Sequence, residues 1–252
     1  MNQQKKAQQF AKLHVNGNPL ILYNAWDAGS AKTIVNAGAQ AIATSSWAVA
    51  EAQGYQDGED LPKGVAEQVI ERIVAIVDVP VSLDFEGGYS EDESALAENI
   101  SRILDLGVVG INFEDRVVKG SSLYSIDKQA KRIAAIRKAA DQKGVALFIN
   151  ARTDIFLGHT KNPPKSIGEA LERAKAYADA GASGYFVPGL VDDVLIGQVC
   201  EGTSLPVNVM VMEGVSPAKQ LAKIGVSRIS YGPIPYIHAM ESLGKQAQKV
   251  LA

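Results

Sequence analysis

The amino-acid sequence predicts a (β/α)8 barrel, in which eight parallel strands alternate with eight helices. The chain has 252 residues, about the length of such a barrel. A helical, charged segment ending in glycine precedes a short apolar run in "NAGAQAIATSS", "DLGVVGINFED", "DAGASGYFVPG" and "KIGVSRISYG". Strict alternation favours the barrel over an open doubly wound sheet, because no G-x-G-x-x-G follows the first strand.

The strands are expected as short apolar runs buried on both faces. In chain order they fall near 20–26, 39–46, 79–86, 107–114, 145–152, 183–188, 206–211 and 226–231. The segments between them, such as "GVAEQVIERIVAIV" and "SIDKQAKRIAAIRKAADQKG", carry apolar residues three and four positions apart, as amphipathic helices do. We therefore treat residues 1–252 as a single barrel domain.

Composition narrows the class of protein. Hydrophobic residues make up 46% and charged residues 21%, as in ordinary globular proteins. A net charge of −3 gives no electrostatic reason to expect nucleic acid or an anionic membrane as a partner. The single cysteine, Cys200, excludes an internal disulfide and a multi-cysteine metal site. With neither a signal-like segment nor a run of 18 apolar residues, the sequence predicts a cytoplasmic protein.

Carboxylates gather where the predicted strands end. In "VPVSLDFEGGYS" the side chains of Asp84 and Glu86 point to the same side, because side chains alternate along a strand. Glu114 ends the next strand, and the carboxyl ends of barrel strands meet at one mouth. An oxygen-rich site with few histidines predicts Mg2+ or Mn2+. We interpret three other polar residues as helix caps: Asp27, Ser90 and Asp154.

Five segments resemble the isocitrate lyase and phosphoenolpyruvate mutase superfamily. They are "LYNAWDAGSA", "AIATSSWAVAEAQGYQDG", "SLDFEGGYS", "GINFEDR" and "NARTD", in the family's order and each at a strand end. The resemblance covers nearly the whole chain. It implies a (β/α)8 barrel whose C-terminal helix is swapped between subunits, and a homodimer or a homotetramer built from two such dimers.

The resemblance also implies a metal site. Asp84 would hold Mg2+ directly, and Glu86 and Glu114 would bind its water ligands. Many family members have Asp-x-Asp where this chain has Asp-Phe-Glu, so the second carboxylate reaches one methylene further.

The implied substrate site lies beside the metal. The backbone N–H groups of Ser45 and Ser46 would bind the substrate carboxylate, and Arg152 would bind the same group or the leaving oxygens. Trp47 departs from the small residues usual in this pocket wall, and Asn208 at the seventh strand completes the substrate-binding set.

The loop 116–125 and Asp57 carry the expected catalytic groups. Isocitrate lyases have a Lys-Lys-Cys-Gly-His loop, but "EDRVVKGSSLYSID" contains no cysteine or histidine, and Cys200 falls on a predicted helix. The loop is more similar to that of the mutase and of phosphonopyruvate hydrolase, which makes Lys119 and Ser121 candidate catalytic residues with Arg152. Asp57 stands where the family has an acid near the reacting carbon.

The leading expectation is a Mg2+-dependent enzyme that cleaves a C–C or C–P bond beside a 2-oxo or 2-hydroxy carboxylate, through an enolate-type intermediate. The alternatives are a phosphonomutase of the phosphoenolpyruvate mutase type and a non-catalytic protein that binds Mg2+ and a 2-oxo acid. A class I aldolase is disfavoured because none of the predicted strands contains a lysine. The expected partner is the small carboxylate substrate.

Overall fold

The computed structural model describes residues 1–120, 122–159 and 163–252 of the chain. The strands are β1 (Leu20–Leu22), β2 (Ile42–Ala43), β3 (Val81–Asp84), β4 (Gly110–Glu114), β5 (Phe148–Arg152), β6 (Gly184–Phe186), β7 (Val207–Met210) and β8 (Arg228–Ser230). The helices are α1 (Gln3–Lys12), α2 (Ala28–Asn36), α3 (Ser46–Ala52), α4 (Lys63–Ile76), α5 (Glu93–Asp105), α6 (Ile126–Gln142), α7 (Pro163–Asp179), α8 (Asp193–Gly202), α9 (Ala218–Lys223) and α10 (Ile234–Leu251). A short irregular helical turn spans Ile155–His159.

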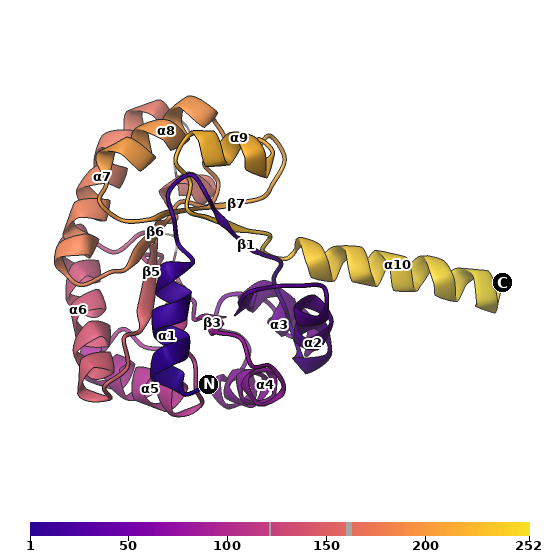
Figure 1. The fold of residues 1–252 in the computed structure, drawn as a ribbon. Coiled ribbons are helices and arrows are strands. Elements are labelled where there is room, and N and C mark those ends of the chain that lie inside the picture. Colours follow the sequence, from indigo (N-terminus) through magenta and orange to yellow (C-terminus); the bar gives the residue numbers. More distant parts are fainter. Residues whose placement is uncertain (121, 160–162) are drawn as a thin grey trace.

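The eight strands form one parallel sheet in the order β1-β8-β7-β6-β5-β4-β3-β2. A single parallel bridge between Ala25 and Thr44 brings its two edges together, with Ala25 N–H donating to the carbonyl of Ala43 at 2.8 Å. Figure 1 shows helices around the outside of this nearly closed barrel. The predicted (β/α)8 barrel is therefore confirmed.

All eight predicted strands are present, each shorter than its apolar run. The predicted segment 39–46, for example, contains only the two-residue strand β2 and the bridged Thr44, because Ser45 already caps α3, which begins at Ser46. The glycines of the recurring motif do end helices: Gly38, Gly107, Gly181 and Gly225 have φ between 95° and 103°. In this left-handed region a Cβ atom is strained, which is why glycine recurs at these positions.

Two of the three predicted caps are wrong. Asp27 does cap α2, with its Oδ1 accepting the N–H of Ser30 at 2.6 Å. The cap of α5 is Asp92 instead of Ser90, because Asp92 Oδ1 accepts the N–H groups of Ser94 and Ala95. Asp154 pairs with an arginine, as described below.

The amino ends of β4 and β5 are covered by α1. Phe10 of this helix is fully buried, and a Cβ added at Gly110 would lie 2.6 Å from its ring. His14 stacks on Phe148 with ring centroids 3.9 Å apart, and its Nδ1 lies 2.8 Å from the carbonyl oxygen of Phe10. The barrel is thus closed at one end, and polar side chains reach solvent at the other.

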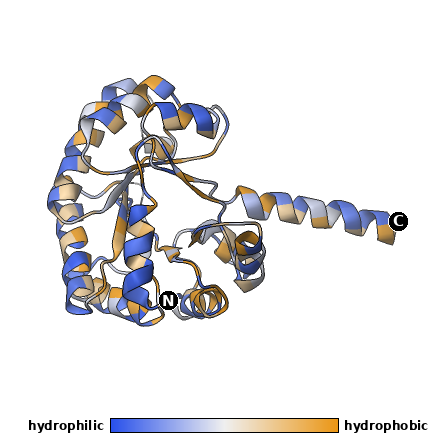
Figure 2. Cartoon of the chain, in the orientation of Figure 1, coloured by the Kyte–Doolittle hydropathy of each residue, from blue (hydrophilic) through white to orange (hydrophobic). Residues whose placement is uncertain are grey.

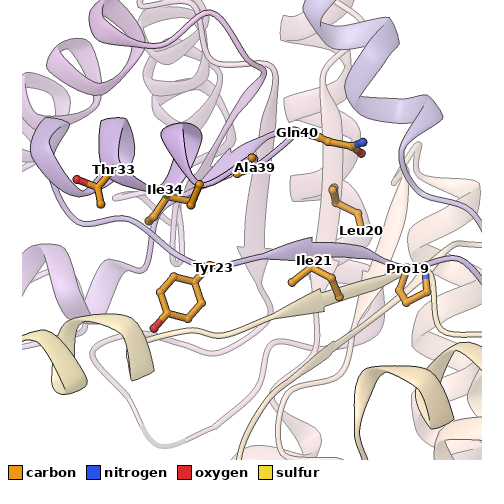
Figure 3. Close-up of a pocket in the computed structure, with 10 residues that line it drawn as sticks. Pro19, Leu20, Ile21, Tyr23, Thr33, Ile34, Ala39 and Gln40 are labelled. Carbon is orange, nitrogen blue, oxygen red and sulfur yellow. The ribbon is translucent and has the colours of Figure 1, made fainter.

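The helix α10 leaves the body of the barrel, as Figure 1 shows. Figure 2 shows hydrophobic residues along this projecting helix, and Leu243, Val250 and Leu251 are 61%, 84% and 85% exposed. A groove of about 530 Å³ lies between β1 and α2, where Ile21 on β1 and Tyr23, which directly follows this strand, are about two-fifths exposed (Figure 3). In the described residues, no helix is long and apolar enough to cross a membrane.

Candidate active site

Strand register brings the predicted acidic residues to one mouth. Asp84 at the end of β3 pairs with Asn112 of β4, and Glu114 at the end of β4 pairs with Arg152 at the end of β5. Asn112 Nδ2 lies 3.3 Å from Asp84 Oδ1 and donates to it. Because neighbouring parallel strands end at the same level, residues far apart in the sequence become the rim of one site.

Ser46 bridges Asp57, the predicted catalytic acid, and Asp84, the predicted metal ligand. Its Oγ lies 2.9 Å from Asp84 Oδ2 and 3.2 Å from Asp57 Oδ1. A hydroxyl has one proton, so it donates to only one of these carboxylates at a time. The N–H of Ser46 donates to Asp84 Oδ2 at 3.0 Å, and the N–H of Ser45 donates to Ala25 at 3.2 Å. Both N–H groups expected to bind a substrate carboxylate are therefore engaged within the protein.

Arg152 is held by two carboxylates. Its Nε and Nη2 donate to the two oxygens of Asp154 at 2.5 and 2.9 Å, and its Nη1 lies 3.1 Å from Glu114 Oε2. The cap predicted for Asp154 is thus wrong, because its side chain orients the arginine. Each terminal nitrogen of a guanidinium has two N–H donors, so Arg152 keeps donors for a further anion.

A buried network fixes Asp154 in turn. Asp115 is fully buried, and its Oδ1 accepts the N–H of Asp154 at 3.0 Å. Its Oδ2 accepts from Arg173 Nη1 at 3.1 Å and from the hydroxyl of Tyr177 at 2.9 Å. A buried charge is stable only when paired and hydrogen-bonded, and Asp115 satisfies both conditions. The position of Arg152 is therefore set from α7.

Burial and mutual repulsion raise the pKa values of the acidic side chains in the site. Burial, and then the charge of Asp84, raises the pKa of Asp57. Burial, followed by the charges of Asp57 and Asp84, raises the pKa of Glu86 to about 8. Burial also raises the pKa of Glu114; the charge of Arg152 lowers it, and the charges of Asp154, Asp84 and Glu86 raise it further. The site holds more negative charge than its own cations neutralise.

A divalent cation fits this excess of charge. In residues 1–120, 122–159 and 163–252, no three His, Cys, Asp or Glu side chains are grouped to hold a metal ion alone. Mg2+ usually keeps several waters and takes one or two protein carboxylates, so it does not need such a group. Asp84 can supply the direct ligand, and Glu86 and Glu114 are the acids available to metal-bound water. The donor set thus suits Mg2+ or Mn2+.

The cavity at the mouth has a volume of about 230 Å³. Six predicted residues line it: Ser45, Ser46, Trp47, Asp57, Asp84 and Arg152. Eight more residues complete the lining: Asn24, Asn112, Leu157, Phe186, Met210, Ser230, Gly232 and Pro233. The period of two along a strand could have identified Asn112, two residues before Glu114. No sequence signal marked the apolar members, because Phe186 and Met210 belong to ordinary buried strands.

Four described residues of the predicted set do not line this cavity: Glu86, Glu114, Asn208 and Lys119. Glu86 borders a small adjoining cavity with Ser46 and Asp84. Asn208 is buried in the barrel, where its Nδ2 donates to Ser230 at 3.2 Å. Lys119 is exposed and lines a neighbouring cavity of about 200 Å³. Ser121 lies outside the described residues.

Comparisons with known proteins identify the family of the chain. The phosphoenolpyruvate phosphomutase family matches residues 10–251. A solved structure from Burkholderia cenocepacia J2315, provisionally named a phosphonomutase, has a TM-score of 0.95 and 43% identity, covering 98% of this chain and 99% of that one. The 2-methylisocitrate lyase of Escherichia coli K12 is 25% identical over 92% of this chain and 79% of its own length.

A further similarity is to a phosphonopyruvate hydrolase solved in complex with oxalate and Mg2+. Its TM-score is 0.86 at 19% identity, covering 99% of this chain and 87% of that one. The match in fold, the extent of the family match and the five motifs lead to one assignment. The chain belongs to the phosphoenolpyruvate mutase and isocitrate lyase superfamily, in which the named relatives are mutases, lyases and hydrolases of small carboxylates.

Proposed function

We propose that the protein is a divalent-metal-dependent lyase that cleaves a C–C bond beside the 2-oxo or 2-hydroxy group of a small carboxylate. One observation carries the proposal: Asp57, Asp84 and Arg152 line a single cavity, with Ser46 bridging the two aspartates. The cavity of about 230 Å³ suits a substrate of few carbon atoms.

A base, a metal ligand and a cation have separate tasks in this cavity. When bound at Asp84, Mg2+ supplies Lewis acidity toward the substrate's oxygen atoms. Asp57 accepts the proton of a 2-hydroxy group or orients a water molecule, and its raised pKa makes it a stronger base than an exposed aspartate. Arg152 binds the anionic group with the donors that Asp154 and Glu114 leave free.

Part of the cavity wall is apolar, which favours carbon over phosphorus in the leaving part of the substrate. Leu157, Phe186, Met210 and Pro233 belong to this apolar part of the lining. Among the described residues of this lining, Arg152 is the one cation. A phosphonate dianion needs several cations or donors, whereas an alkyl group gains free energy against this wall.

A turnover screen by NMR tests the proposal. The wild-type protein with Mg2+ would be incubated with oxaloacetate, with phosphonopyruvate and with a branched 2-hydroxy diacid. The variant Asp84→Asn keeps the shape of the side chain but removes the charge that binds the metal, and Mn2+ affinity measured by electron paramagnetic resonance reports the metal independently. We expect C–C cleavage by the wild type only, with Mn2+ affinity at least tenfold weaker in the variant.

Two other outcomes of this screen would contradict the proposal. Turnover that persists in Asp84→Asn would contradict the metal assignment. Binding of oxalate with Mg2+, without turnover of any compound, would support the non-catalytic 2-oxo-acid-binding protein instead.

Cleavage of a C–P bond is the second candidate. The relative with 43% identity is provisionally named a phosphonomutase, and the loop carrying Lys119 is similar to that of the phosphonate enzymes. Release of phosphate from phosphonopyruvate would favour this candidate and make Lys119 and Ser121 the next residues to substitute. Conversion to phosphoenolpyruvate would indicate the mutase.

We also propose that two copies of the chain exchange α10. In a barrel the helix after β8 covers the outside of the sheet beside β1, and the groove between β1 and α2 is open there (Figure 3). Ile237, Met240 and Leu243 lie three residues apart on α10, which gives that helix an apolar stripe. The exchanged helix of a second copy would cover the groove and the stripe together.

A further inference from the structure

All non-glycine residues with left-handed backbone among the described residues lie beside the active site. Glu59, Glu86 and Tyr89 have φ values of 58°, 48° and 58°. A side chain in this region is strained, and such residues persist only where the surrounding structure holds them. They belong to two loops, 57–59 and 86–90, which are about 30 residues apart in the chain. Their grouping indicates that the two loops hold each other.

The hydrogen bonds between the loops are reciprocal. Oε2 of Glu86 accepts the N–H of Gly58 at 3.0 Å and the N–H of Glu59 at 2.8 Å. In the other direction, Oε1 of Glu59 accepts the N–H of Tyr89 at 2.7 Å. Each loop thus supplies a carboxylate for backbone donors of the other. We call this arrangement the glutamate clamp, formed by Glu59 and Glu86.

One side of the clamp is anchored to the barrel. Arg132 of α6 is buried and donates to the carbonyl of Ser90 at 3.0 Å and to that of Gly87. Its guanidinium carbon lies 4.7 and 4.4 Å from the ring centroids of Phe113 and Tyr124. Asn99 of α5 donates to the carbonyl of Gly88 at 3.0 Å. The loop 86–90 is therefore rigid, and the loop 57–59 is fastened to it.

Asp57 directly precedes the clamped residues. The clamp fixes the backbone at Gly58 and Glu59, while Ser46 Oγ contacts the Asp57 carboxylate at 3.2 Å. The side chain of Asp57 is thus set from both sides, by the loop that carries it and by α3. A shift of about 1 Å in a reacting group can lower a rate by about 100-fold.

The clamp also contacts the loop after β4. A Cβ added at Gly87 would lie 2.6 Å from Cγ2 of Val118 and 3.0 Å from Oε1 of Glu59. Val118 therefore packs directly on the backbone of Gly87, in a space that only glycine leaves free. The N–H of Val117 donates to the carbonyl of Ser122 at 2.9 Å, so the loop that presents Val118 has structure of its own.

We propose that Glu59 is a positioning residue: with Glu86 it holds Asp57 in place at the mouth and provides the surface on which Val118 rests. The assignment rests on the proposed function in one respect, because it takes Asp57 as the group that acts on the substrate. The clamp itself does not depend on which bond is cleaved.

The test compares Glu59→Ala and Glu59→Gln with the control Glu51→Ala, which removes an exposed glutamate from α3. Hydrogen exchange of the segments 54–62 and 86–91 reports the clamp without any turnover. We expect exchange about tenfold faster in both segments of Glu59→Ala, because Tyr89 loses its acceptor. Glu59→Gln keeps an oxygen for that N–H and should remain close to the wild type. Unchanged exchange in Glu59→Ala would overturn the clamp, whether or not a substrate is known.

Kinetics with a substrate that the wild type cleaves test the positioning role. In Glu59→Ala we expect kcat to fall about 100-fold, with KM and Mn2+ affinity within about threefold of wild type. Faster exchange with an unchanged kcat would overturn the positioning role while leaving the proposed function intact. A wild type without turnover would refute the proposed function, and the exchange measurement would still decide on the clamp.

A pair of variants tests the contact with Val118. Gly87→Ala places a methyl group against Val118 and, less closely, against Glu59 Oε1, so it should lower kcat. Adding Val118→Ala removes the closer contact and should restore part of the lost kcat. Failure of the second substitution to restore activity would remove Val118 from the proposal.

Discussion

The pair of Arg152 and Asp154 gives the sharpest test of how the site is built. Asp154→Asn keeps the size of the side chain, but it removes the charge and turns one acceptor into a donor that faces the guanidinium. The Arg152 side chain is 16% exposed and that of Asp154 only 2%, so solvent screens the pair weakly.

The expected loss of folding free energy in Asp154→Asn follows from this burial. Removing one partner of a buried pair costs about 3–5 kcal/mol, and Glu114 still compensates part of the charge of Arg152, so we expect about 3 kcal/mol. For a domain of this size that corresponds to a fall in melting temperature of roughly 10 °C. If Arg152 also binds the substrate anion, KM should rise by about tenfold, since a hydrogen bond to a charged group is worth about 1.5–3 kcal/mol.

Urea denaturation followed by circular dichroism measures the change, with Asp179→Asn as control. Asp179 pairs with Lys175 on the exposed face of α7, where both side chains are more than two-thirds exposed, so its variant should keep the wild-type midpoint. Equal midpoints for Asp154→Asn and the wild type would refute the reasoning that Asp154 holds Arg152.

Three further predictions concern pH and assembly. His14 has its pKa lowered to about 3 by burial, so the unfolded chain binds its proton first and stability falls by about 1.4 kcal/mol per pH unit below pH 6.5. His14→Phe should lack this component in denaturation series from pH 6.5 to 4; parallel slopes would contradict it. Activity should fall as pH drops through the raised pKa of Asp57. The hydrogen bond from Ser46 lowers this pKa, so Ser46→Ala should move the acidic limb of the pH–activity profile to higher pH. An unmoved limb would argue against Asp57 as the base. Leu243→Glu should convert a dimer or larger assembly to monomer in light scattering, and a monomeric wild type would refute the helix exchange.

The repeating pattern of the sequence determined the barrel. Eight apolar runs alternate with amphipathic segments, and the glycines that end four helices adopt the left-handed backbone expected of them. These features are local, because helix caps, periodicity and glycine conformation depend on residues a few positions apart. The same pattern placed Asp84, Glu114 and Arg152 at strand ends, where the barrel brings them together.

Tertiary structure decided what each side chain contacts at that mouth. The sequence predicted caps at Ser90 and Asp154, yet Asp92 caps α5 and Asp154 binds Arg152. Asp27 and Asp154 show the same local pattern of an acid before a helical segment, and only the contact with Arg152 makes Asp154 an ion-pair partner instead of a cap.

The clamp between Glu59 and Glu86 is a second case in which the local sequence does not predict a side chain's contacts. Its partners are 27 to 30 residues apart, and neither glutamate stands in a spacing that predicts the other. Sequence alone determined the fold and placed Asp84, Glu114 and Arg152 at strand ends, because both follow from periodicity along the chain. The apolar lining residues Phe186 and Met210 became visible only in the tertiary structure. The hydrogen bonds that orient Asp57 and Arg152 depend on which loops meet in space, and the tertiary structure decided them.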